Sequence, residues 1–387
     1  MAEHRPRSVF AAIALAIVGA PACASSEQPS AAATSSGAGG APTGAGGAGG
    51  AGGDSFAGSG GHGGSADCYC APGLHNDRIF VLSDDAELWT YDPVSNAFEL
   101  VAPVPCGGGS AFSMAVDPLG RAWVLFADTH AIATLDLASP AACDDPGYTK
   151  DQEGFGLFGM AFSSASAIDA CAKLYVHSYS GAGPFGEGKD AGRLGVIDPA
   201  TGQLTPIGPI DYDGGELAGT GDGRLFAFAG VAPAKLVEYD KATAKPVATT
   251  PLGLEKTNAS AFAFFAGDIY FFTEAPPAGC ADCLTASCAA DYSSCIADPA
   301  CNSGLECAIA QGDITDTCGG GMPTAMQNCL FGCAACFPQP EDRVSRVTRM
   351  DHDSSEGPGQ ALTVVVDAAP IRIVGAGASP CVPVVPR

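Results

Sequence analysis

The chain has 387 residues, a formal net charge of -24 at pH 7 and 47% hydrophobic residues. So acidic a surface is repelled by phosphate backbones and by anionic lipid head groups, so we expect neither a nucleic-acid partner nor direct binding to a membrane surface. The hydrophobic content is high enough to bury a core, which excludes a wholly disordered chain.

Residues 1–23 are predicted to be an export signal. Arg5 and Arg7 supply a basic start, and the apolar run at residues 9–20 (VFAAIALAIVGA) is too short to span a bilayer. Its end allows two outcomes. Residues 20–23 (APAC) form an imperfect lipobox, with Ala where Leu is usual, and Cys23 then becomes the lipidated N-terminus. Alternatively the signal is cut at an A-x-A site and Cys23 is lost with it.

A linker rich in Gly, Ala and Ser follows at residues 24–67. It has no apolar face, so we expect a flexible coil with a root-mean-square reach of roughly 35 Å. A cysteine at the end of a leader, followed by a long linker, is typical of a tethered protein. We therefore favour lipidation of Cys23, which would give contact with the membrane through the lipid anchor only.

Short apolar runs separated by turn residues predict strands over the rest of the chain. The clearest unit, residues 113–139 (SMAVDPLGRAWVLFADTHAIATLDLAS), reads as three strands joined by turns at residues 117–120 and 128–130. Related units recur on both sides of it. The expected strands are 79–82, 87–92, 98–104, 113–116, 121–127, 131–137, 160–162, 173–180, 193–198, 203–207, 216–219, 224–229, 235–240, 247–252, 261–265, 268–273, 344–350 and 361–367.

An apolar residue followed by Asp ends the third strand of each unit, at Asp92, Asp136, Asp198, Asp240 and Asp351. Such an Asp starts a turn by accepting a hydrogen bond from the backbone two residues on. The steps between these residues are 44, 62, 42 and 111. Repeats near 40–45 residues with about four strands each predict an all-β fold, a β-propeller, with extra segments in the longer steps. A β-sandwich is the rival all-β fold.

The first unit lacks an inner strand before Arg78, and residues 370–377 (PIRIVGAG) form a lone strand at the other end of the chain. The simplest solution is that the C-terminal strand completes the first blade and closes the ring. This gives five blades, with six or seven as alternatives. The propeller then comprises residues 68–277 and 339–387.

Residues 278–338 interrupt the last unit between its second and third strands. This stretch is rich in Ala and poor in β-branched residues, and its spacing predicts helices with a break at Asp298-Pro299 and a further short helix at residues 322–337. We therefore expect a small disulfide-rich α-helical insertion on one face of the ring.

The chain has 17 cysteines, and in an exported protein they are expected to form disulfides. Cys106 and Cys143 follow the first and second units at similar positions and are expected to pair. A bond from Cys381 to Cys68 or Cys70 would lock the closing strand. The disulfide candidates are Cys68, Cys70, Cys106, Cys143, Cys171, Cys280, Cys283, Cys288, Cys295, Cys301, Cys307, Cys318, Cys329, Cys333, Cys336 and Cys381.

Two CxxC pairs, Cys280/Cys283 and Cys333/Cys336, flank the insertion, and such spacing also suits a four-cysteine zinc site. Export favours five disulfides among the ten cysteines of the insertion, so we assign no metal and no cofactor.

No catalytic constellation is recognisable. His177 is the one histidine on a predicted strand, and we interpret it as a local hydrogen-bonding residue because only hydroxyls neighbour it in sequence. The acidic loops at residues 211–216 (DYDGGE) and 351–353 (DHD) could bind Ca²⁺ if folded around it. Neither has the closing Glu of a calcium loop, so solvated turns are the preferred interpretation.

The segments SMAVDPLGRAWVLF, FGMAFSS, ELAGTGDGRLFAF, AFAFFAGDIYFFT and IVGAGASPC together resemble a group of uncharacterised propeller-like lipoproteins of myxobacteria. The insertion resembles small Cys/Ala-rich helical modules in secreted proteins of the same bacteria. The resemblance implies export and a propeller-like fold, and it brings no activity or site residues.

The sequence therefore favours an exported, lipid-anchored protein of the cell envelope, in the outer membrane or periplasm or else secreted. Its expected function is non-enzymatic binding of a protein or a glycan. The alternatives are a hydrolase or lyase with its site in the propeller channel, and a structural envelope protein without a ligand.

Overall fold

The computed structural model describes residues 68–73, 76–106, 109–179, 191–212, 215–230, 234–254, 257–311, 318, 321–339, 342–353 and 360–385. The export signal with Cys23 and the linker at residues 24–67 lie outside the described residues. No helix in these ranges has the length and apolarity needed to cross a bilayer.

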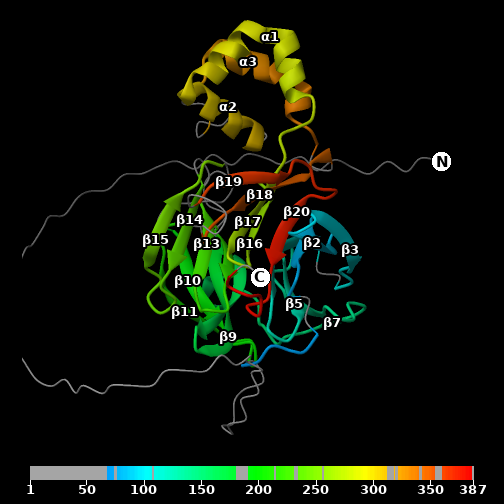
Figure 1. Ribbon diagram of the computed structural model, residues 1–387, viewed down its shortest axis with the longest axis vertical. Coiled ribbons are helices and arrows are strands. Elements are labelled where there is room, and N and C mark those ends of the chain that lie inside the picture. The colour runs from blue at the N-terminus through cyan, green and yellow to red at the C-terminus, as the bar shows by residue number, and fades with distance from the viewer. Residues whose placement is uncertain are drawn as a thin grey trace, which may run out of the picture. The chain divides into compact units, whose positions relative to one another are not determined.

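The strands form five four-stranded antiparallel sheets, the blades of a β-propeller (Figure 1). Blade 1 is β20 (Ile373–Gly377), β1 (Ile79–Ser83), β2 (Glu87–Asp92) and β3 (Ala97–Pro103), and blade 2 is β4 (Ala111–Val116), β5 (Arg121–Phe126), β6 (Ile132–Asp136) and β7 (Cys143–Asp144). Blade 3 is β8 (Leu157–Ser166), β9 (Asp169–Tyr179), β10 (Arg193–Ile197) and β11 (Leu204–Pro209). Blade 4 is β12 (Glu216–Gly219), β13 (Leu225–Ala229), β14 (Lys235–Tyr239) and β15 (Pro246–Pro251). Blade 5 is β16 (Ser260–Phe265), β17 (Asp268–Glu274), β18 (Ser345–Met350) and β19 (Leu362–Val366).

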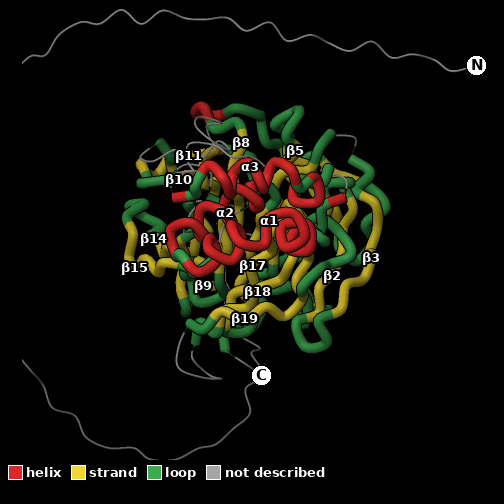
Figure 2. Tube along the Cα trace, turned by 90° about the horizontal axis from the view of Figure 1, so that it is seen from above, coloured by secondary structure: helices red, strands yellow, loops and turns green. Residues whose placement is uncertain are grey.

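The inner strands β4, β8, β12, β16 and β20 neighbour one another around the axis. Outer strands such as β3, β15 and β19 lie at the rim in the view from above (Figure 2). The five-blade prediction is confirmed, and the alternatives of a sandwich or of six or seven blades are wrong.

The C-terminal strand closes the ring as expected. Strand β20 pairs antiparallel with β1, and Phe80 lies opposite Gly377 and Val81 opposite Ala376. A disulfide between Cys70 and Cys381 fastens the segment before β1 to the segment after β20. The two ends of the folded chain are therefore held together by one sheet and one covalent bond.

Small residues let the inner strands approach closely. A Cβ atom on Gly159 of β8 would overlap the carbonyl oxygen of Gly215, and one on Gly219 of β12 would overlap the carbonyl oxygen of Phe162. Only glycine fits where two backbones come this close. The glycines and alanines of the inner strands therefore narrow the axis of the propeller.

The core lies between the blades, and this explains which strands read as continuous apolar runs. Every residue of β13 (LFAFA) is buried, whereas β15 (PVATTP) at the rim is almost wholly exposed. Trp123 of blade 2 is fully buried, with its ring centroid 5.5 Å from that of Phe162 in blade 3. Burying one such side chain contributes about 2–3 kcal/mol, so the interblade contacts supply much of the stability.

The Asp residues that end the third strands behave as predicted in four blades. The Oδ1 atoms of Asp92, Asp136, Asp198 and Asp240 each accept a hydrogen bond from the backbone N–H two residues on, at 2.8–2.9 Å. Asp351, which follows the third strand of blade 5, is instead buried and lies next to Asp268.

One strand of the structure was not predicted from the sequence. Strand β7 has only two residues, Cys143 and Asp144, which is too short to show a period. Cys143 thus lies inside its blade, whereas Cys106 follows its own, so their positions are less alike than expected. The structure nevertheless joins these two cysteines in a disulfide.

The insertion leaves the ring between β17 and β18 and forms three helices, α1 (Cys280–Ala297), α2 (Pro299–Gln311) and α3 (Thr324–Gly332), followed by a 3₁₀ turn at Ala334–Cys336. The helix break at Asp298 is as predicted. All ten cysteines of this module are paired, as Cys280–Cys336, Cys283–Cys333, Cys288–Cys329, Cys295–Cys301 and Cys307–Cys318. The two CxxC pairs thus bond to each other. So small a module cannot bury a large apolar core, and the disulfides compensate.

Candidate functional site

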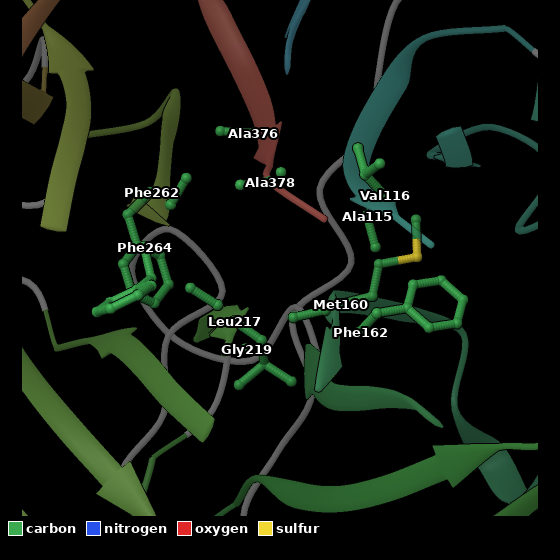
Figure 3. Close-up of a pocket in the computed structure, with 14 residues that line it drawn as sticks. Ala115, Val116, Met160, Phe162, Leu217, Gly219, Phe262, Phe264, Ala376 and Ala378 are labelled. Carbon is green, nitrogen blue, oxygen red and sulfur yellow. The ribbon is translucent and has the colours of Figure 1, made fainter. Parts of the chain in front are cut away.

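The propeller axis offers no room for a substrate in the part of the chain that the structure describes. Its central cavity measures about 10 Å³, which is at most the space for one water molecule. The side chains around it are apolar, and the labelled ones carry only carbon and, in Met160, sulfur (Figure 3). Ser113 Oγ of β4 donates to Glu216 Oε2 of β12 at 3.0 Å, which links blades 2 and 4 across the ring.

His177 is a buried structural residue. It lies on β9 with no exposed surface, and its Nδ1 accepts a hydrogen bond from the Gly215 N–H at 3.0 Å. A nitrogen that accepts a hydrogen bond carries no proton, so the ring N–H of His177 lies on Nε2. The structural role expected from the sequence fits this contact, but the partner is the backbone of Gly215 rather than a neighbouring hydroxyl, and the bond ties blade 3 to the start of blade 4.

A groove of about 420 Å³ lies between α2 of the helical module and blade 5. This volume falls within the range of small-ligand sites. Its walls combine apolar and charged groups: Ile309 and Glu306 on α2, Val364 on the outer strand β19, and Arg343 and Arg346 where the chain returns to the ring. A mixed lining of this kind suits recognition of a ligand with both apolar and polar parts.

The base of the groove is held by a buried ion-pair network. Glu274, at the end of β17, accepts from Arg343 Nη1 at 2.7 Å and from Arg372 Nε at 2.8 Å. Arg372 also donates to Asp84 Oδ2 at 3.1 Å. The network therefore joins both stems of the helical module to the closing strand and to blade 1, and it fixes the charges at the base of the groove.

A second, more open groove of about 670 Å³ runs between blades 3 and 4. Lys241 lies in it, and its Nζ donates to Ser163 Oγ at 3.2 Å, to the carbonyl oxygen of Ser164, and to that of Ala165 at 3.2 Å. All three acceptors belong to blade 3, so Lys241 joins the two blades. Its hydrogen bonds are used within the protein, which makes this groove the weaker candidate.

The stability of the protein should depend on pH through Lys241. Burial lowers the pKa of Lys241 from 10.5 to about 8. Between these values the unfolded chain binds more protons than the folded one, so raising the pH favours folding. We expect the stability of the wild type relative to Lys241→Met to rise from about pH 8 to about pH 9.5, as measured by urea unfolding. A constant difference across this range would refute the assignment.

The two acidic loops have different fates. In the first, Asp211 Oδ1 accepts from the Tyr239 hydroxyl at 3.2 Å and Glu216 Oε2 accepts from Ser113 on another blade, so these two groups are engaged separately; Asp213 lies outside the described residues. In the second, Asp351 and Asp353 converge with Asp268, and one carboxylate oxygen of each lies within 4.8 Å of the others. Asp268 lies more than 80 residues earlier and was missed from the sequence.

The sequence contains no motif that indicates either of the two grooves or the Asp268 cluster. The groove brings together loop residues such as Leu254, helix residues such as Ile309 and strand residues such as Val364. The only signal that could have found Asp268 is the hairpin pairing of β17 with β18, which places Ile269 opposite Met350 and so puts the residues beside them in contact.

The sequence matches no family model and no curated protein. Among solved structures, it is similar to the hydrazine synthase of Kuenenia stuttgartiensis, with 12% identity over 74% of this chain and 65% of that chain and a TM-score of 0.32. A streptogramin B lyase is 15% identical over 53% of this chain and 61% of that chain, with a TM-score of 0.32. The Dos1 propeller is 11% identical over 50% and 52%, with a TM-score of 0.31. The chain thus spans less than two thirds of each of these proteins, and such distant similarity assigns it no activity.

Proposed function

We propose that the protein is an exported, lipid-anchored β-propeller of the cell envelope that acts as a non-enzymatic binding protein. Its anchor is Cys23, in the outer membrane or facing the periplasm; if Cys23 is instead removed, the same protein is secreted. The partner is a protein or a glycan of the envelope, and it binds in the groove between α2 and blade 5.

The main support for the proposal is the difference in size and lining between the groove and the axial cavity. The groove offers about 420 Å³ with a mixed apolar and charged lining, whereas the axis offers about 10 Å³ and apolar groups only. The described residues that line the axial cavity include no carboxylate and no histidine, and the Glu216 carboxylate that reaches across the ring accepts a hydrogen bond from Ser113.

The disulfides support the location. Eight disulfides are typical of an oxidising, extracytoplasmic compartment. Lipidation of Cys23 predicts a mature protein whose mass begins at residue 23 and includes the acyl groups. Intact mass spectrometry of the purified protein tests this directly.

The first described cysteines lie at the edge of the propeller opposite the helical module. Cys68 and Cys70 are bonded to Cys171 and Cys381, near the ends of the inner strands. The helical module leaves from the end of β17, at the opposite edge of the blade. The N-terminal end of the described chain and the helical module are therefore at opposite edges of the propeller.

A charge placed in the groove should abolish binding. Val364 lines the groove and is 44% exposed, so Val364→Glu should fold normally while placing a carboxylate against the apolar part of a ligand. We expect at least a tenfold loss of partner capture from envelope extracts or of glycan-array signal, which corresponds to about 1.4 kcal/mol.

Val247→Glu is the matched control, because Val247 is a 64% exposed valine on β15, the outer strand of blade 4. It makes the same chemical change on an equivalent strand outside the groove, so it should bind like the wild type. Equal loss in both variants, or binding retained in Val364→Glu, would place the binding surface elsewhere.

A further inference from the structure

Three carboxylates meet at one corner of blade 5. Asp268 opens β17, and Asp351 follows β18 directly; because Ile269 pairs with Met350, the two aspartates lie side by side. With Asp353 they place one carboxylate oxygen each within 4.8 Å of the others. Asp268 and Asp351 are buried and Asp353 is exposed, so the cluster opens to solvent on one side.

The Asp268 carboxylate is only half satisfied. Its Oδ2 accepts from Arg349 Nε at 2.7 Å, but its Oδ1 is buried and accepts no hydrogen bond, and the side chain as a whole is 10% exposed. A buried carboxylate oxygen without a donor costs free energy unless a cation or a proton offsets it. Burial, together with the charges of Asp353 and Asp351, raises the pKa of Asp268 despite the contact with Arg349.

We propose that Asp268, Asp351 and Asp353 bind one Ca²⁺ ion. All the ligand atoms are carboxylate oxygens, which hard cations prefer and which transition metals do not select. The convergence of three carboxylate groups on one point also favours a divalent cation, which attracts all three.

The cluster also favours calcium over magnesium. Ca²⁺ accepts six to eight oxygen ligands in flexible geometry, so water can complete its shell on the side of exposed Asp353. Mg²⁺ requires a near-ideal octahedron and gives up its water reluctantly. The histidine between the two aspartates takes no part: His352 Nε2 lies 3.3 Å from Arg224 Nη1, and its ring packs against Phe226 of blade 4.

Calcium would fasten the turn before β17 to the end of β18, the two strands between which the helical module is inserted. The site lies at the opposite end of β17 from Glu274 at the base of the groove, and it does not depend on the proposed binding function. An extracytoplasmic protein meets calcium at concentrations that suit a weak site, and such modules bind with dissociation constants of about 10⁻⁴–10⁻³ M.

The test is calorimetric titration of the full-length, disulfide-intact protein with CaCl₂ after removal of metals with a chelator. We expect one site. Calcium at about 100 times its dissociation constant should shift the folding equilibrium about 100-fold toward the folded state, seen as a higher midpoint of thermal unfolding. MgCl₂ at equal concentration should give a smaller shift.

Two variants probe the site, Asp268→Asn at its buried end and Asp353→Asn at its exposed end. Each should lose the heat of binding and the calcium-dependent shift. Asp136→Asn is the matched control, because it removes the same charge at the end of the third strand of blade 2, and Asn preserves the turn there. It should respond to calcium like the wild type.

Absence of a calcium heat in the wild type would overturn the proposal. An unchanged calcium response in Asp353→Asn would also overturn it. Because Asp353 is exposed, a lost response in this variant cannot be attributed to misfolding. A response that falls equally in Asp136→Asn would also overturn it, because calcium would then be screening the net charge of the whole protein.

Discussion

Replacing Cys70 and Cys381 together by alanine should lower the free energy of unfolding by roughly 5–6 kcal/mol, according to the chain-entropy treatment of disulfides. This bond joins residues 311 positions apart, the largest separation of any disulfide in the protein. Without it, the ring is closed by non-covalent contacts alone, chiefly the pairing of β20 with β1 and the ion pair of Arg372 with Asp84. Guanidinium chloride unfolding under non-reducing conditions, followed by tryptophan fluorescence, would measure the loss.

The matched control is the pair Cys106 and Cys143, which are 37 positions apart and also lie in the propeller. Their replacement by alanine should cost roughly 4 kcal/mol, less than the closing bond, because a shorter loop loses less entropy in the unfolded chain. If the two double variants were equally stable, or if the order were reversed, closure at Cys70–Cys381 would not restrain the ring.

Glu274→Ala should lower the free energy of unfolding by about 3–5 kcal/mol, the usual effect of removing one partner from a buried ion pair. The Glu274 side chain is only 2% exposed and serves two guanidinium groups, those of Arg343 and Arg372. Its removal leaves both cations without their shared acceptor at the base of the groove. Thermal and denaturant unfolding would give the magnitude.

An exposed ion pair provides the contrast. Arg78 Nη1 lies 2.9 Å from Glu99 Oε2, and the two side chains are 34% and 73% exposed. Solvent screening makes such a pair worth at most about 1 kcal/mol, so Glu99→Ala should be nearly neutral. Comparable losses in Glu274→Ala and Glu99→Ala would mean that the network around Glu274 does not hold the module and the ring together.

Features that repeat along the chain could be predicted from sequence. Asp92, Asp136, Asp198 and Asp240 end equivalent strands and form equivalent turns, because a short carboxylate after an apolar strand residue bonds its own backbone. The first unit lacks an inner strand, and the C-terminal strand β20 is the one strand without a unit of its own. The repeat of the strands and the one missing inner strand were therefore enough to predict a closed five-bladed propeller.

Features that depend on contacts between distant residues were not predictable. The groove forms because α2 lies beside Val364 in the folded chain, and neither segment carries a sequence pattern that indicates this contact. The cluster around Asp268 needs the hairpin register of β17 and β18 across a long insertion. Asp351 was expected to be an ordinary turn residue like its counterparts, but in blade 5 it is buried next to a second carboxylate.

The most direct test of the account is disulfide mapping of the native protein, by mass spectrometry of peptides from a non-reducing digest. We predict a peptide that links Cys70 to Cys381, together with the reciprocal pairs Cys280–Cys336 and Cys283–Cys333 in the helical module. A free thiol at Cys381, or its bonding to a cysteine of the module, would contradict the closed ring. So would cysteines recovered in reduced form, which would also contradict export to an oxidising compartment.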